Sequence, residues 1–193
     1  MIKLGFENKI IASKGKLLLS EPFMKEDYFS RSVILLTEHD NDKGSVGLII
    51  NKPADINISE LIPEFSDYDA PVYFGGPVNM DNIFYIHTFG NKINEAKHIC
   101  DRLYWGGDFE QLCNMAKQSE YNSKQIKFFA GYAGWSAGQL NNELEEKSWI
   151  VSNLPDKLDV FNNDEKSLWS NILKSMGGEF TTISNFPLNP QDN

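Results

Sequence analysis

The sequence predicts a single α+β domain, with paired strands in the first half of the chain and helices mainly in the second. Apolar runs rich in Val, Ile and Leu, joined by short turns, occupy the first half. Amphipathic segments with apolar residues at helical spacing follow in the second half. Hairpins that precede helices favour this class over a doubly wound parallel sheet. The length of 193 residues fits one domain.

The first elements that we expect are strands at residues 16–20, 32–39 and 45–51. The turn-forming stretch Asp40–Gly44 has the length that closes a hairpin between the last two strands. Both faces of these strands are apolar, so we expect a sheet that is covered on both sides. Pro53 is expected to end the third strand, and a helical turn is expected shortly after it, before Pro63.

The remaining elements alternate between strands and helices. Further strands are expected at 72–74, 83–88, 98–105, 126–132 and 149–152. Helices are expected after the N-cap Asp108, over 139–147, and over 164–176, where Gly177 and Gly178 stop the last one. We take residues 15–180 as the domain, residues 1–14 as an N-terminal segment and residues 181–193 as a loose tail.

The composition excludes several classes of protein. With 27 acidic and 18 basic residues, the net charge is −9, and the basic residues occur in pairs such as Lys14/Lys16 and Lys124/Lys127. Direct binding to nucleic acid or to an anionic membrane is therefore disfavoured, because both need clustered Lys and Arg. No signal peptide or membrane-spanning run is visible, and two separated cysteines make no disulfide framework. We expect a cytoplasmic protein.

Four ordered motifs are more specific than any periodicity. They are Gly15–Pro22 continuing to Arg31-Ser32-Val33 and Glu38-His39; Gly47–Pro53; Tyr73–Val78; and Gly131–Leu140. In this order they resemble the YqgE/AlgH family of bacterial proteins, over about Gly15 to Gly178. The resemblance implies one α+β domain whose mostly antiparallel, bifurcated sheet forms a pseudo-barrel flanked by helices. It implies no established reaction, since members are described as uncharacterised or as candidate transcriptional regulators.

The chain departs from the family pattern in one place. Family members usually continue Gln-Leu-Glu-x-Glu, whereas here Leu140 is followed by Asn141, Asn142 and Glu143. Of the two carboxylates in the pattern, Glu143 alone remains.

The segment Gly134–Gly138 matches GxSxG, the nucleophile elbow of serine hydrolases, between an expected strand and an expected helix. In that fold the histidine follows the serine, whereas His39, His87 and His98 all precede Ser136. We therefore expect a glycine turn rather than a catalytic serine. The helix N-terminus that follows could receive a small anion or a carboxylate of a partner, although packing of Trp135 over the core explains the same residues.

Metal and cofactor sites are not indicated. Glu38-His39-Asp40, and His98 with Cys100, are the nearest approaches to a ligand group, but neither has the paired spacing of a structural zinc site. No cofactor motif such as a P-loop is present.

Polar, glycine and aromatic residues within the motifs form the candidate binding set. An ion pair of Arg31 with Glu38 or Glu143 that locks the sheet is the structural alternative. The set comprises Arg31, Glu38, His39, Asn51, Tyr73, Gly75, Gly76, Tyr132, Gly134, Trp135, Gln139 and Glu143.

Three functional hypotheses follow. The first is a non-catalytic binding or regulatory protein that acts on a protein or small-molecule partner and has no catalytic residue. The second is a small hydrolase or redox-linked enzyme that uses His39 or Ser136. The third is a transcription factor, which the resemblance suggests and which the acidic charge and the lack of a helix-turn-helix pattern oppose.

Overall fold

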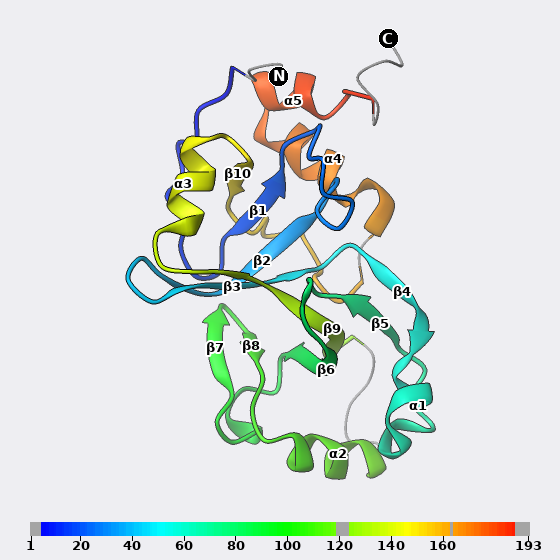
Figure 1. Ribbon diagram of the computed structural model, residues 1–193. Helices are drawn as coiled ribbons and strands as arrows, with labels where there is room; N and C mark the ends of the chain where they lie inside the picture. The colour runs from blue at the N-terminus through cyan, green and yellow to red at the C-terminus, as the bar shows by residue number, and fades with distance from the viewer. Residues whose placement is uncertain (1–4, 119–123, 163, 188–193) are drawn as a thin grey trace.

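The computed structural model describes residues 5–118, 124–162 and 164–187 (Figure 1). Ten strands lie in this part of the chain. They are β1 (Leu17–Ser20), β2 (Val33–Asp40), β3 (Gly44–Ile49), β4 (Pro53–Asn57), β5 (Pro71–Phe74), β6 (Val78–His87), β7 (Lys97–Cys100), β8 (Leu103–Trp105), β9 (Ile126–Trp135) and β10 (Trp149–Ser152). The helices of the same residues are α1 (Ile58–Leu61), α2 (Phe109–Lys117), α3 (Gln139–Glu145), α4 (Glu165–Met176) and α5 (Glu179–Ile183).

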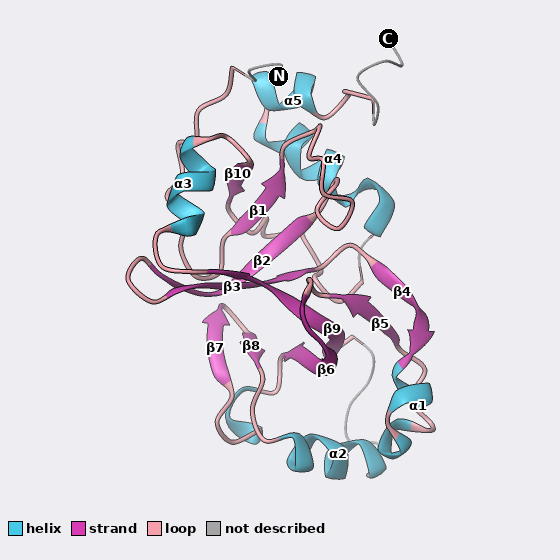
Figure 2. Ribbon diagram, in the orientation of Figure 1, coloured by secondary structure: helices cyan, strands magenta, loops and turns pink. Residues whose placement is uncertain are grey.

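The strands form one branched, open sheet, which confirms the α+β class. Its main path runs β10-β1-β2-β3-β9-β6-β8-β7, while β5 also pairs with β9 and β4 pairs with β5. Every pair is antiparallel except β5 with β9. The branch lies in β9, whose first half runs between β5 and β6 and whose last residues pair with β3. Figure 2 shows α3, α4 and α5 around one end of the sheet and α1 and α2 at the other.

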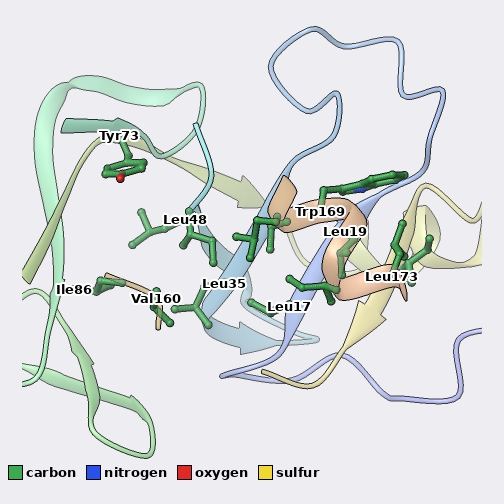
Figure 3. Close-up of a cluster of buried hydrophobic side chains, with 14 of the residues drawn as sticks. Leu17, Leu19, Leu35, Leu48, Tyr73, Ile86, Val160, Trp169 and Leu173 are labelled. Atoms are coloured by element: carbon green, nitrogen blue, oxygen red, sulfur yellow. The ribbon is translucent and has the colours of Figure 1, made fainter. Parts of the chain in front are cut away.

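The sheet is buried on both faces around β1–β3, as the apolar pattern predicts. Val33 and Leu35 belong to one hydrophobic cluster and Ile34 and Leu36 to another. The first cluster is covered by α4 and α5, and Figure 3 shows Leu17, Leu35 and Leu48 between Trp169 of α4 and Tyr73 of β5. A further cluster lies between α2 and the β5, β6 and β9 strands. The first cluster contains residues of β1 and β2 and also of β5, β6 and β9, so it packs against both parts of the branched sheet.

Two expectations about strands were wrong. The single strand expected at 98–105 is the hairpin of β7 and β8, because the chain turns at Asp101, which has a φ of 45°. Pro53 does not end the third strand, since β3 ends at Ile49 and Pro53 is the first residue of β4. β4 pairs with β5 alone, and an edge strand tolerates a residue without an N–H.

The fold also extends past the expected boundary at residue 180. Residues 181–183 complete α5, where the apolar Phe180 and Ile183 are 9% and 4% exposed in the first cluster. Phe186 stacks on Phe23 with ring centroids 5.6 Å apart. The expected loose tail thus does not describe residues 181–187, and its remaining residues, 188–193, lie outside the described part of the chain.

Candidate functional site

The candidate site is a hollow of about 620 Å³ between the β2–β3 hairpin and the end of β9, called the hairpin hollow below. Five residues of the candidate binding set line it: Glu38, His39, Tyr132, Gly134 and Trp135. The other lining residues are Lys14, Asp40, Lys43, Gly44, Ser45, Val46 and Val78. Strand pairing thus brings the Glu38-His39 motif and the Gly131–Leu140 motif together, although they are far apart in the chain.

The turn of the hairpin is held from inside and outside. Asp40 Oδ1 accepts hydrogen bonds from the backbone N–H of Asp42 at 2.9 Å and of Lys43 at 3.1 Å. The first of these bonds is the largest cause that lowers the pKa of Asp40. From outside, the N–H of Gly138 donates to the carbonyl of Asn41 at 3.1 Å. These three hydrogen bonds hold the turn that forms the rim of the hollow.

His39 and Ser45 face each other across the hairpin. They are partners in the β2–β3 register, and His39 Nδ1 lies 2.8 Å from Ser45 Oγ. Ser45 is only 4% exposed, because β3 is paired with β2 on one side and with β9 on the other. An imidazole bonded to a hydroxyl is a group found in hydrolases, but here it is also an ordinary cross-strand hydrogen bond.

The charged groups of the rim have specific partners. Glu38 forms an ion pair with Lys97 of β7. Lys14 Nζ donates to the carbonyl of His98 at 3.0 Å. The floor is apolar and aromatic, with Val46, Val78, Tyr132 and Trp135. An apolar floor with a few polar groups on its rim is typical of small-molecule sites.

Glu143 and Gln139 build a network below the hollow instead of lining it. Glu143 Oε2 accepts the indole N–H groups of Trp135 at 2.8 Å and of Trp149 at 2.7 Å, while Oε1 accepts from Gln139 Nε2 at 2.9 Å. Gln139 Oε1 in turn accepts from Ser136 N and Oγ, at 3.0 and 3.1 Å. These bonds hold Trp135 in place in the floor of the hollow.

Arg31 and Asn51 lie at another place in the fold. Asn51 Oδ1 accepts from the N–H of Val33 at 2.8 Å, and its amide donates to the carbonyl of Arg31 at 2.9 Å. The guanidinium of Arg31 lies 4.0 Å above the Trp169 ring and donates to the carbonyls of Phe186 and Pro187, at 2.7 and 2.9 Å. The ion pair with Glu38 or Glu143, which was the structural alternative for Arg31, is not formed, because Arg31 binds the C-terminal segment.

Tyr73, Gly75 and Gly76 are packed against β9. The Tyr73 hydroxyl donates to Glu165 Oε1 at 2.6 Å, and the side chain is 5% exposed. A Cβ on Gly75 would lie 2.2 Å from the carbonyl oxygen of Gly131, and one on Gly76, whose φ is 152°, would lie 2.1 Å from the carbonyl carbon of Tyr132. The structure therefore does not bring these three residues into the hairpin hollow.

The GxSxG segment does not have the surroundings of a nucleophile elbow. The Ser136 hydroxyl bonds to Gln139, while the imidazoles bond to Ser45, to the carbonyl of Gly106 and to the carbonyl of Asp101. Burial lowers the pKa of His87, which sits in the core. Within the described residues, no imidazole is hydrogen-bonded to Ser136.

The described part of the chain shows neither a metal-binding cluster nor a membrane-spanning helix. No group of three or more His, Cys, Asp and Glu side chains there could hold a metal ion. His98 is exposed, whereas Cys100 packs against the core. No helix among residues 5–118, 124–162 and 164–187 combines the length and apolar character needed to cross a bilayer.

Several lining residues were missed in the sequence: Lys14, Lys43, Ser45, Val46 and Val78. A signal for Ser45 was present, because residues 39 and 45 flank the expected turn symmetrically and so oppose each other in a hairpin. Val78 is the last residue of the Tyr73–Val78 motif, but nothing in the sequence places it beside the hairpin; it reaches the hollow because it pairs with Tyr132 of β9.

Comparisons with known proteins agree with this architecture. A family model described as AlgH-like matches residues 17–181. A "UPF0301 protein" from Chlorobaculum parvum is 40% identical over 173 residues, which are 90% of this chain and 91% of the relative. Another from Cytophaga hutchinsonii is 39% identical over 182 residues, or 94% of this chain and 99% of the relative.

Two solved structures have the same fold. The solution structure of the AlgH protein from Pseudomonas aeruginosa has a TM-score of 0.70 at 23% identity, and covers 93% of this chain and 98% of its own. A crystal structure of a Corynebacterium diphtheriae protein has a TM-score of 0.71 at 22% identity, and covers 94% and 95%. At these identities the likeness concerns the fold alone.

Proposed function

The chain belongs to the AlgH-like family, and from this premise we propose that it is a non-catalytic binding protein which holds a ligand or a segment of a partner in the hairpin hollow. One observation supports the proposal most. Glu38, His39, Tyr132, Gly134 and Trp135, all singled out from motifs of the sequence, line a single hollow of about 620 Å³. That volume lies within the range of about 300–1,000 Å³ that small-molecule pockets have.

The hollow is suited to binding because its walls are already rigid. The hairpin turn is bonded within itself at Asp40 and to the start of α3 at Asn41, and Trp135 is held by Glu143. A site that is ordered before binding loses little conformational freedom when the ligand enters. This favours recognition of a ligand over a mechanism that needs the walls to close.

The family resemblance suggests that this binding serves a regulatory role. We propose that the protein acts in the cytoplasm and that it contacts a protein or a small ligand instead of DNA. The charge supports this choice, since the chain carries −9 overall. The pair Lys124/Lys127 cannot present two amines to phosphates, because Lys127 is 3% exposed. Anisotropy of a labelled 30-base-pair duplex tests this point, and tight binding that weakens steeply with salt would contradict it.

The binding function is tested by titrating fragments into ¹⁵N-labelled protein. Saturable shifts are expected in the amides of Val46, Tyr132 and Gly134, which line the hollow. Gly134→Val should abolish them, because a Cβ there points at the Tyr132 ring, 3.1 Å from Cε2, and narrows the floor. Gly5→Val is the matched control, since nothing lies within 4 Å of a Cβ at that exposed glycine. Shifts that Gly134→Val leaves unchanged would refute the proposal.

The second candidate function is a small hydrolase, and the contact of 2.8 Å between His39 and Ser45 is the observation that favours it. The low exposure of Ser45 opposes it, because a nucleophile must reach its substrate. Hydrolysis of p-nitrophenyl acetate separates the two functions. Turnover above the buffer rate that disappears in a folded His39→Gln variant would favour the enzyme, whereas equal rates in both proteins support a binding protein.

A further inference from the structure

The chemistry of the rim suggests which ligands the hollow selects. Resting on the proposed function above, we propose that the hairpin hollow binds a singly charged carboxylate that is carried on an aromatic or aliphatic group. The carboxylate would meet Lys43, Lys14 and the His39–Ser45 pair, and the apolar group would lie on the floor.

The two acidic side chains of the rim are already engaged. Glu38 is paired with Lys97, and Asp40 Oδ1 accepts two backbone N–H groups within the turn. Neither carboxylate therefore has to be neutralised by the ligand. A cationic ligand at Glu38 would have to compete with Lys97.

The donors that face the hollow are less fully used. Lys14 has one carbonyl partner for its three N–H groups, at His98. Lys43 lies in the turn of the hairpin and lines the hollow. Its ammonium group interacts electrostatically with the Asp40 carboxylate. The lining residues Lys14 and Lys43 equal the Glu38 and Asp40 carboxylates in number, and Lys97, which lies outside the lining, pairs with Glu38. Because Glu38 is paired and Asp40 Oδ1 is bonded within the turn, the amines of Lys14 and Lys43 remain to receive one negative charge on the ligand.

A monoanion fits this rim better than a phosphate. Doubly charged phosphates are held best by paired arginines or by several backbone N–H groups together. No arginine is among the residues that line the hollow, and the hairpin amides of Asp42 and Lys43 are bonded to Asp40. The ammonium group of lysine acts as a point charge, and a single carboxylate is enough to neutralise it.

The floor explains why the carboxylate needs an apolar partner group. Val46 and Val78 lie beside the rings of Tyr132 and Trp135, so an aromatic or aliphatic group would bury apolar surface there. Binding by strand addition is excluded at β3, because β2 and β9 occupy both of its edges at residues 45–47. Recognition at β3 then goes through the side chains that line the hollow.

The test compares 3-phenylpropionate with the uncharged 3-phenylpropanamide, which has almost the same shape, in ¹⁵N titrations at pH 7 and low salt. We expect the acid to bind about tenfold more tightly, the size of one charge-assisted contact at a partly exposed site. Lys43→Gln should reduce the preference to about threefold or less. Lys174→Gln, a change at an exposed lysine of α4, should leave it intact.

The source of the carboxylate is resolved by a second pair of probes, N-acetyl-Ala-Ala-Phe as its free acid and as its carboxamide. A preference for the tripeptide acid over 3-phenylpropionate indicates the C-terminus of a chain, and the reverse indicates a small acid. Equal binding of acid and amide in the wild type overturns the inference but leaves the proposed function standing. If no fragment of any charge saturates the hollow, the proposed function itself fails.

Discussion

Lys127 offers a quantitative test of the core, because it is an ammonium group buried in β9. Its side chain is 3% exposed, its Nζ donates to the carbonyl of Val160 at 3.1 Å, and Nζ lies 3.6 Å above the Tyr73 ring. Burial is the largest effect and lowers the pKa of Lys127 from 10.5 to about 8, although Glu165 and Asp159 act in the opposite direction. We consider the change Lys127→Met, which keeps an unbranched side chain and removes the ammonium group.

The sign follows from the lowered pKa. The unfolded chain holds the proton of Lys127 up to about pH 10.5, whereas the folded chain loses it near pH 8. Stability therefore rises with pH between these values, and the burial penalty is fully present below pH 8. Between pH 7 and 9.5 the contribution changes by about 2 kcal/mol. Lys127→Met has no proton to lose, so its stability relative to the wild type should fall by this amount over the same range.

Urea unfolding at pH 7.0, 8.0, 9.0 and 9.5 measures this difference for both proteins. At pH 7 the loss of the bond to Val160 and of the contact with Tyr73 offsets part of the gain, so Lys127→Met should be about 1 kcal/mol more stable. Lys174→Met, at an exposed lysine, should run parallel to the wild type. If the wild-type and Lys127→Met curves also run parallel from pH 7 to 9.5, the buried ammonium does not act as described.

Three further changes test the polar network and the glycine turns by urea unfolding. Glu143→Ala should lower the free energy of unfolding by about 3 kcal/mol because two indole N–H groups lose a charged acceptor, while Glu145→Ala, at an exposed site, should change it by less than about 0.5 kcal/mol. Gly76→Ala should cost about 3 kcal/mol or more, since its Cβ would meet the backbone of β9 at 2.1 Å, whereas Gly138→Ala has open space and should cost only about 1 kcal/mol of left-handed strain. Ser136→Ala removes one exposed hydrogen bond of the hydroxyl, so the free energy of unfolding should fall by no more than about 1 kcal/mol. A larger loss, or loss of ligand binding in the folded variant, would show a role that the geometry does not support.

The parts of the fold that local chemistry determines could be predicted from the sequence. The turn Asp40–Gly44 closes the β2–β3 hairpin, and Asp108 accepts the N–H of Gln111 at 3.1 Å to start α2, as its spacing predicts. Gly177 ends α4 with a φ of 72°. Each of these signals acts between residues a few positions apart, so no knowledge of the remote chain is needed.

Other parts depend on contacts that are remote in the chain. The turn between β7 and β8 has no Gly or Pro, and its one local signal is Asp101, a residue type that tolerates the left-handed conformation but is also common elsewhere. The short β4 is a strand because β5 lies beside it. α5 extends beyond the expected boundary because Ile183 completes a core that was built earlier in the chain.

The candidate site divides in the same way. The motif residues Glu38, His39, Tyr132, Gly134 and Trp135 do meet in one hollow, which sequence order alone could not show. Arg31 binds the carbonyl of Phe186, a partner that is invisible to spacing. The twelve-residue binding set as a whole stays a prediction, since part of it lies in networks that explain those residues by structure alone.

The central position of β9 has a consequence for how the protein is made. β3, β5 and β6 all need Ile126–Trp135 as a neighbour, and all three precede it in the chain. A ribosome that has released residues up to 125 has exposed apolar strands whose shared partner is still in the exit tunnel. Nascent chains stalled before that point should bind chaperones, whereas chains stalled well after Trp135 should resist protease.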